Sequence, residues 1–148
     1  MPAWTLRPVA NPSRRQALAA LLGLGAVALG AGCSREDPPA SSDVVSLEEA
    51  RAAHEAGRAV LIDIRERDEH ATGVAKGARL LPMSQLRQRV AEIPTDPAMP
   101  VLLICHTQSR SSATLKALRQ SGYAHVRYVH GGMSGWMRRG WPVVAPGA

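Results

Sequence analysis

The chain has 148 residues and a formal charge of +6, which leaves room for one domain with a single core. Phe is absent and aromatic residues are few, so we expect a core of Leu, Val, Ile and Ala. Basic residues are dispersed among acidic ones, without a basic stripe or interleaved stacking aromatics, which argues against nucleic-acid binding. The five histidines lack paired-ligand spacing and no second cysteine lies near Cys105, so no metal site is expected.

Residues 1–33 have the plan of an export signal. Arg14 and Arg15 precede an uncharged run that is rich in Ala, Leu and Gly and extends to Gly32. Paired arginines indicate the twin-arginine route, and the segment that ends at Cys33 resembles a bacterial lipobox, which would place a lipid on that cysteine. A transmembrane anchor is the competing interpretation, but the apolar run is shorter than the roughly 20 residues that span a membrane. We therefore predict an exported protein, periplasmic or membrane-anchored as a lipoprotein.

The rest of the chain is predicted to be one domain behind a tether. Residues 34–43 are polar and contain paired prolines and paired serines, which is typical of a flexible linker. From residue 44 to residue 145, short apolar runs alternate with helical patterns. We predict helices at 47–56, 84–91, 111–121 and around Trp136, and strands at 60–63, 101–104 and 126–129. This alternation defines an α/β domain with a central, mainly parallel sheet flanked by helices.

Seven residues between a buried strand and a helix carry the chemistry. The apolar run 101–104 leads to Cys105, and a polar segment follows as far as Arg110 and Ser111. Unpaired N–H groups at a helix start and in a curled loop form an anion site, where a thiol ionises more readily. The alternative is an inert core cysteine, but the packing of such a residue does not require five polar residues and an arginine directly after it. We therefore predict a nucleophilic Cys105 at the strand end, where open α/β sheets bind ligands.

Two further blocks of the sequence accompany the cysteine loop: Asp63, Ile64 and Arg65 with Glu69, Gly73, Gly77 and Ala78; and Gly131 and Gly132 with Trp136, Gly140, Pro142 and Val143. Together the three blocks resemble the rhodanese family of sulfurtransferases, and the resemblance covers nearly all of residues 44–145. The resemblance implies a single rhodanese-like domain, with its active-site loop between a central strand and the following helix. It further implies that a donor such as thiosulfate gives its outer sulfur to Cys105, which forms a persulfide. A thiophilic acceptor, cyanide or a thiol on a small molecule or a protein, then removes that sulfur without a cofactor.

The resemblance also assigns the other site residues. The substrate-binding cradle, formed mostly by backbone, would consist of His106, Thr107, Gln108, Ser109, Arg110 and Ser111. Asp63 and Arg65 would support this loop. Two roles stay open for Arg110, which would either bind an anionic donor or brace the loop against a carboxylate such as Asp63 or Glu69. We favour bracing slightly.

Loop length and Gln108 separate the remaining hypotheses. A cysteine phosphatase or an arsenate reductase relative would place five residues between cysteine and arginine, whereas this chain has four. The rhodanese family usually has Gly at the position of Gln108, where a residue without Cβ turns easily. A strained or reshaped cradle with a changed choice of donor is therefore expected. If Gln108 abolishes turnover, the domain would be a non-catalytic persulfide carrier or a partner-binding module.

Overall fold

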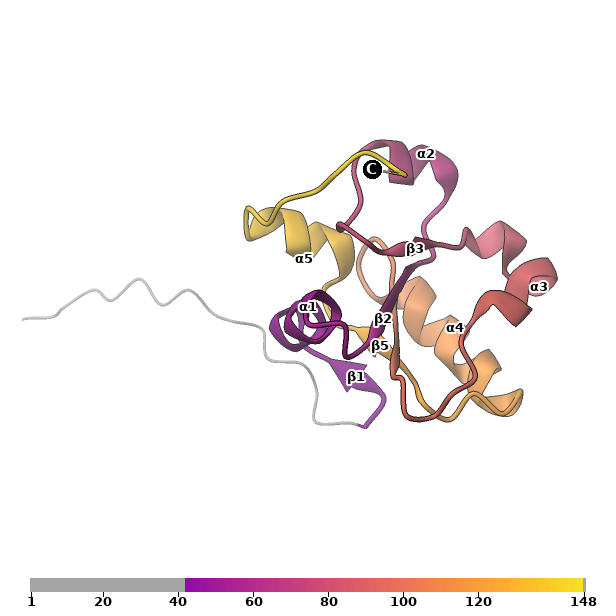
Figure 1. Cartoon of the computed structure of the whole chain (residues 1–148). Coiled ribbons are helices and arrows are strands. Elements are labelled where there is room, and N and C mark those ends of the chain that lie inside the picture. The colour runs from indigo at the N-terminus through magenta and orange to yellow at the C-terminus, as the bar shows by residue number, and fades with distance from the viewer. Residues whose placement is uncertain (1–41, 148) are drawn as a thin grey trace, which may run out of the picture. The chain divides into compact units, whose positions relative to one another are not determined.

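The computed structural model describes residues 42–147. Five strands form one sheet in the order β1-β5-β4-β2-β3, and every neighbouring pair is parallel (Figure 1). The elements in chain order are β1 (Val44–Val45), α1 (Leu47–Glu55), β2 (Val60–Asp63), α2 (Arg67–Ala71), β3 (Arg79–Leu80), the 3-10 helix η1 (Met83–Gln85), α3 (Leu86–Arg89), the 3-10 helix η2 (Val90–Glu92), β4 (Val101–Ile104), α4 (Ser109–Gln120), β5 (Val126–Val129) and α5 (Gly132–Arg138). The predicted α/β class with a central parallel sheet is confirmed. The predicted export signal, with Cys33, lies outside the described residues.

The central strand β4 is apolar throughout because both faces of the sheet are covered. Its side chains alternate, so Val101 and Leu103 join the cluster under α3 and α4, whereas Leu102 and Ile104 join the cluster under α1 and α5. All four are buried, and burying each contributes roughly 1.5–3 kcal/mol relative to exposure. Cys105 continues the alternation on the α3 and α4 side. The fold therefore fixes the cysteine at the carboxyl end of its central strand.

Helix α1 begins at the predicted capping box. The Ser46 hydroxyl accepts a hydrogen bond from the Glu49 N–H, and the Glu49 carboxylate accepts one from the Ser46 N–H. Hydrogen bonds from the backbone and hydroxyl of Ser46 hold the pKa of Glu49 below its usual value. Gly57 follows α1 with a positive φ of 67°, which confirms the predicted stop.

Two predicted helices differ in their boundaries. The sequence pattern predicts one helix over 84–91, but a single turn of α-helix lies there between two 3-10 turns, η1 and η2. Turns of 3-10 helix are frequent at the two ends of α-helices and in short connections. Helix α4 begins at Ser109 rather than at Ser111, because the carbonyl of Gln108 already accepts a hydrogen bond from the Ser112 N–H at 2.8 Å. The earlier start places Ser109, Arg110 and Ser111 in the first turn of α4, and the other three cradle residues precede the helix.

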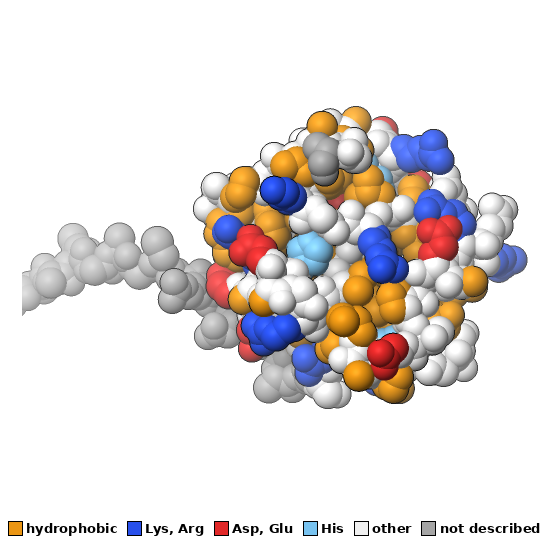
Figure 2. Space-filling model, viewed as in Figure 1, with side chains coloured by type: hydrophobic (Ala, Val, Ile, Leu, Met, Phe, Trp, Pro, Cys, Tyr) orange, Lys and Arg blue, Asp and Glu red, His pale blue; other side chains and the backbone are white. Residues whose placement is uncertain are grey.

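The surface of the domain mixes charges of both signs. On the face in Figure 2, Lys and Arg side chains lie interspersed with Asp and Glu side chains, and this face carries no continuous basic stripe. Within residues 42–147, none of the helices combines the length and apolar character needed to cross a bilayer.

Candidate active site

Cys105 lies directly after β4 with a side chain that is almost fully buried. Its exposure is 1%, and its Sγ lies 3.4 Å from the hydroxyl of Ser111, in the first turn of α4. The same hydroxyl is 3.1 Å from the carbonyl of Gln108. A thiol can donate to Oγ while the hydroxyl proton goes to this carbonyl, whereas a thiolate or persulfide can receive the hydroxyl proton instead. Ser111 can therefore serve both protonation states of the sulfur.

Helix α5 binds the outer side of the cysteine loop. The N–H of Met133 donates to the carbonyl of Cys105, and the N–H of Ser134 donates to the carbonyl of His106, both at 2.8 Å. In a trans peptide the carbonyl and the following N–H point in opposite directions. The N–H groups of His106 and Thr107 therefore point away from α5. Together with the unpaired N–H groups at the start of α4, they leave donors for an anion on the inner side of the loop.

Gly132 permits this close approach. A Cβ atom at this position would lie 2.5 Å from the carbonyl oxygen of Cys105 and 2.6 Å from that of His106, and it would also overlap that of Thr107. Gly132 also has a positive φ of 55°. A residue without Cβ is required on both grounds.

Gln108 connects the loop to the same turn. Its side-chain oxygen accepts a hydrogen bond of 3.0 Å from the N–H of Gly131. Its φ is −158°, and no residue other than glycine within 42–147 has a positive φ. The predicted strain at Gln108 is therefore not found in its backbone. The left-handed conformations fall instead on Gly131 and Gly132, which lie opposite the loop.

Arg110 forms a bidentate ion pair with Glu69 of α2. Its two terminal nitrogens donate to the two carboxylate oxygens at 2.7 Å and 2.6 Å. These hydrogen bonds lower the pKa of Glu69 from 4.5 to about 2, and they raise the pKa of Arg110. Of the two carboxylates that the sequence offered as a brace, Asp63 is already paired with Arg65. The structure thus places Arg110 against Glu69.

The pair of Asp63 and Arg65 acts on the loop through α2. Both side chains are buried, and three hydrogen bonds of 2.7–3.0 Å join the guanidinium to the carboxylate. Two further N–H groups of Arg65 donate to the carbonyl of Glu69, within α2, and to that of Gly73, just beyond the C-terminal end of α2. A buried charge pair of this kind is stable only when its other hydrogen-bonding groups are satisfied, as they are here. Arg65 therefore fixes α2, and α2 presents the Glu69 carboxylate to Arg110.

The other predicted cradle residues face solvent. His106, Thr107 and Ser109 are exposed, so the loop can be reached from outside the domain. Sequence reasoning missed the backbone donors of Met133 and Ser134, although the Gly131-Gly132 pair was a visible signal for a close approach. Among residues 42–147, no group of three or more His, Cys, Asp or Glu side chains could hold a metal ion.

A cysteine-containing loop at the carboxyl end of a central parallel strand defines the class of α/β domain to which this site belongs. Residues 46–139, more than half of the chain, match the family of the Rhodanese-like domain, and the chain belongs to that family. A protein of Allochromatium vinosum named "Sulfurtransferase" is 39% identical over 87 residues, which cover 59% of this chain and 79% of that protein.

Two solved structures share the fold. A rhodanese-related protein from Thermoplasma volcanium is 26% identical with a TM-score of 0.61, over 68% of this chain and 96% of that one. The human single-domain sulfurtransferase TSTD1 is 26% identical with a TM-score of 0.57, over 67% of this chain and 98% of that one. The relatives of this chain thus include sulfurtransferases.

Proposed function

We propose that the protein is a sulfurtransferase that carries sulfane sulfur as a persulfide on Cys105. The observation that supports this most directly is the position of its Sγ, beside the Ser111 hydroxyl and behind the N–H groups of the loop. These groups can stabilise negative charge on one sulfur and then on a second one attached to it.

In the first half-reaction the Cys105 thiolate attacks the outer sulfur of a donor such as thiosulfate. A new S–S bond forms on Sγ, the S–S bond of thiosulfate breaks, and sulfite leaves with the bonding electron pair. The Cys105 persulfide keeps one negative charge. N–H donors of the loop and the Ser111 hydroxyl stabilise it, so the chemistry proceeds by nucleophilic catalysis with the protein's own groups.

In the second half-reaction an acceptor takes the outer sulfur. Cyanide attacks that sulfur, the S–S bond to Sγ breaks, and thiocyanate leaves while the thiolate of Cys105 is regenerated. A thiol acceptor reacts in the same way through its thiolate and becomes a persulfide. The exposed His106 and Thr107 are at the mouth of the loop, where a small or a protein acceptor can approach.

The domain from residue 42 onward, incubated with thiosulfate and cyanide, is expected to produce thiocyanate over many turnovers. Cys105→Ala should abolish this activity, and its retention would overturn the assignment. Intact mass separates enzyme from carrier, since a stable gain of one sulfur without repeated turnover would identify a persulfide carrier or partner-binding domain. Because Arg110 binds Glu69, and because the loop is one residue short for a phosphoryl group, no hydrolysis of an aryl phosphate is expected.

We propose further that residues 1–33 export the domain by the twin-arginine route and that Cys33 carries a lipid. The paired arginines, the uncharged run and the cysteine at its end support this. The protein would then act in the periplasm or on a membrane surface.

A further inference from the structure

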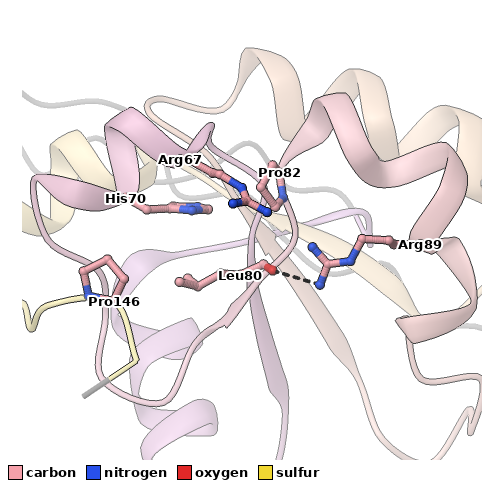
Figure 3. Close-up of a pocket in the computed structure, with 6 residues that line it drawn as sticks. All are labelled: Arg67, His70, Leu80, Pro82, Arg89 and Pro146. Atoms are coloured by element: carbon pink, nitrogen blue, oxygen red, sulfur yellow. Dashed lines mark hydrogen bonds between the residues drawn. The ribbon is translucent and has the colours of Figure 1, made fainter.

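A pocket of about 320 Å³ lies at the β3 edge of the sheet. It is lined by Arg67 and His70 of α2, Leu80 of β3, Pro82, Arg89 of α3 and Pro146. None of the residues of the cysteine loop, 105–111, lines it. Figure 3 shows the His70 ring and the guanidinium groups of Arg67 and Arg89 directed into one space beside Leu80.

The donors in this pocket are incompletely neutralised. Arg89 is engaged by the carboxylate of Glu92 and by the Leu80 carbonyl. The Arg67 side chain is exposed and forms no hydrogen bond or ion pair with any residue in 42–147. Its guanidinium therefore brings a positive charge to the pocket that no carboxylate of the described domain offsets.

His70 forms the inner wall of the pocket. Its side chain is 4% exposed, and its buried Nε2 lies 3.4 Å from Asp63 Oδ1, within ionic-contact distance but without a hydrogen bond to any residue in 42–147. The edge of the ring that carries Nε2 therefore faces the buried carboxylate, and the contact with an anionic head falls to Arg67.

The remaining walls are apolar and select the ligand further. Leu80, Pro82 and Pro146 offer carbon surface, and the volume exceeds the space that a small inorganic ion needs. From this combination we propose that the pocket binds small organic carboxylates or sulfonates that carry an apolar group. The anionic head lies against the Arg67 guanidinium, and the apolar body lies beside the His70 ring, on Leu80 and the two prolines.

Benzoate and benzenesulfonate are suitable probes, with benzamide as the neutral control. We expect nuclear magnetic resonance titrations of the domain to show saturable shifts of the His70 imidazole and the Leu80 methyl signals with both anions and much weaker shifts with benzamide. Arg67→Gln should weaken binding about tenfold, because it removes a charge-assisted contact. Arg87→Gln is the matched control, since Arg87 is an exposed arginine of the neighbouring α3 and does not line the pocket.

Equal affinity for benzamide, equal affinity of Arg67→Gln, or shifts confined to residues 105–111 would overturn this proposal. The titration needs no turnover and is repeated with Cys105→Ser, which removes the sulfur nucleophile but should leave binding unchanged. The titration therefore tests anion binding in the pocket separately from sulfur transfer at Cys105.

Discussion

Gly132 is the position at which the cysteine loop tolerates no side chain. A Cβ there overlaps three carbonyl oxygens of the loop, and the backbone is left-handed. We expect Gly132→Ala to reduce the free energy of unfolding by about 3 kcal/mol or more, because left-handed strain adds to steric displacement of the loop. Gly140→Ala provides the control, since Gly140 has a similar φ of 66° but a Cβ added there would meet nothing within 4 Å.

Urea unfolding of both variants measures the difference. Both variants place an alanine in a left-handed backbone conformation, and the loss of unfolding free energy from this is common to the two. The additional loss for Gly132→Ala therefore measures the contact with the cysteine loop. A similar decrease in the free energy of unfolding for Gly132→Ala and Gly140→Ala would show that the loop can move away from α5 without destabilising the domain.

The ion pair of Glu69 and Arg110 is expected to depend on pH in a defined direction. Because the pKa of Glu69 is lowered from 4.5 to about 2, the pair stabilises the folded protein above pH 4.5, and this contribution is lost as the pH falls from 4.5 through 2. Glu69→Gln should lower the free energy of unfolding by about 1–2 kcal/mol at pH 7, since the pair is bidentate but partly exposed. The difference from the unmodified protein should shrink steadily as the pH is lowered below 4.5.

Glu55→Gln is the comparison for Glu69→Gln. Glu55 pairs with Arg51 on the exposed surface of α1, where such a pair contributes about 0.3–0.5 kcal/mol. Urea unfolding at each pH should therefore separate the two variants at neutral pH. If Glu69→Gln and Glu55→Gln lower the free energy of unfolding equally, the ion pair of Glu69 and Arg110 stabilises the domain no more than an ordinary surface pair.

Single residues of the site are predictable from sequence to different degrees. The polar run after an apolar strand is enough to select Cys105, and bracing by a carboxylate is the slightly favoured of two roles for Arg110. The choice between Asp63 and Glu69 depends on a contact between residues 41 positions apart, which no local pattern encodes. The hydrogen bond from Gly131 to the Gln108 side chain was not predictable for a similar reason, because the two residues lie 23 positions apart in the chain.

At the scale of elements, α2 is the part that transmits support to the loop. It has only five residues, too few to be stable without tertiary contacts, and Arg65 holds the carbonyls of Glu69 and Gly73 on either side of its end. Arg65→Met should destabilise the domain by about 3–5 kcal/mol, because the buried carboxylate of Asp63 loses its partner. Urea or thermal unfolding measures the loss.

Two variants sharpen that test. Arg58→Met, at an exposed position, controls for the loss of an arginine and should change stability by less than about 0.5 kcal/mol. Asp63→Asn combined with Arg65→Met removes the unpaired charge and should recover part of the lost stability. No recovery in the double variant would assign the loss to the carbonyl contacts of Arg65 alone.

The long elements of the fold follow from the sequence and the short ones do not. The strands β2 and β4 are largely apolar runs, β5 consists mostly of β-branched and aromatic residues, and α1 has a capping box, so local patterns are sufficient. The edge strands β1 and β3 have two residues each, and their pairing is set by neighbours in space. Helix α2 is not among the predicted helices, because its charged sequence carries no apolar periodicity.

For the whole molecule, the proposed lipid on Cys33 predicts membrane association. In a bacterial host that exports it, the full chain should fractionate with membranes, and Cys33→Ala should move it to the soluble fraction. Cys105→Ala is the control, because it removes the other cysteine of the chain and should leave fractionation unchanged. Unchanged fractionation of Cys33→Ala would refute the lipid anchor.

The bonds from Met133 and Ser134 to the cysteine loop join segments about 28 positions apart. Opening the loop breaks both bonds, so their amide protons should exchange with solvent only when the loop opens. Hydrogen exchange at these two amides is therefore a local measure of loop motion, readable without a substrate. Formation of a persulfide on Cys105 should slow this exchange if the added sulfur is held by the inner N–H groups. The start of the C-terminal helix would then report the loading state of the sulfur site.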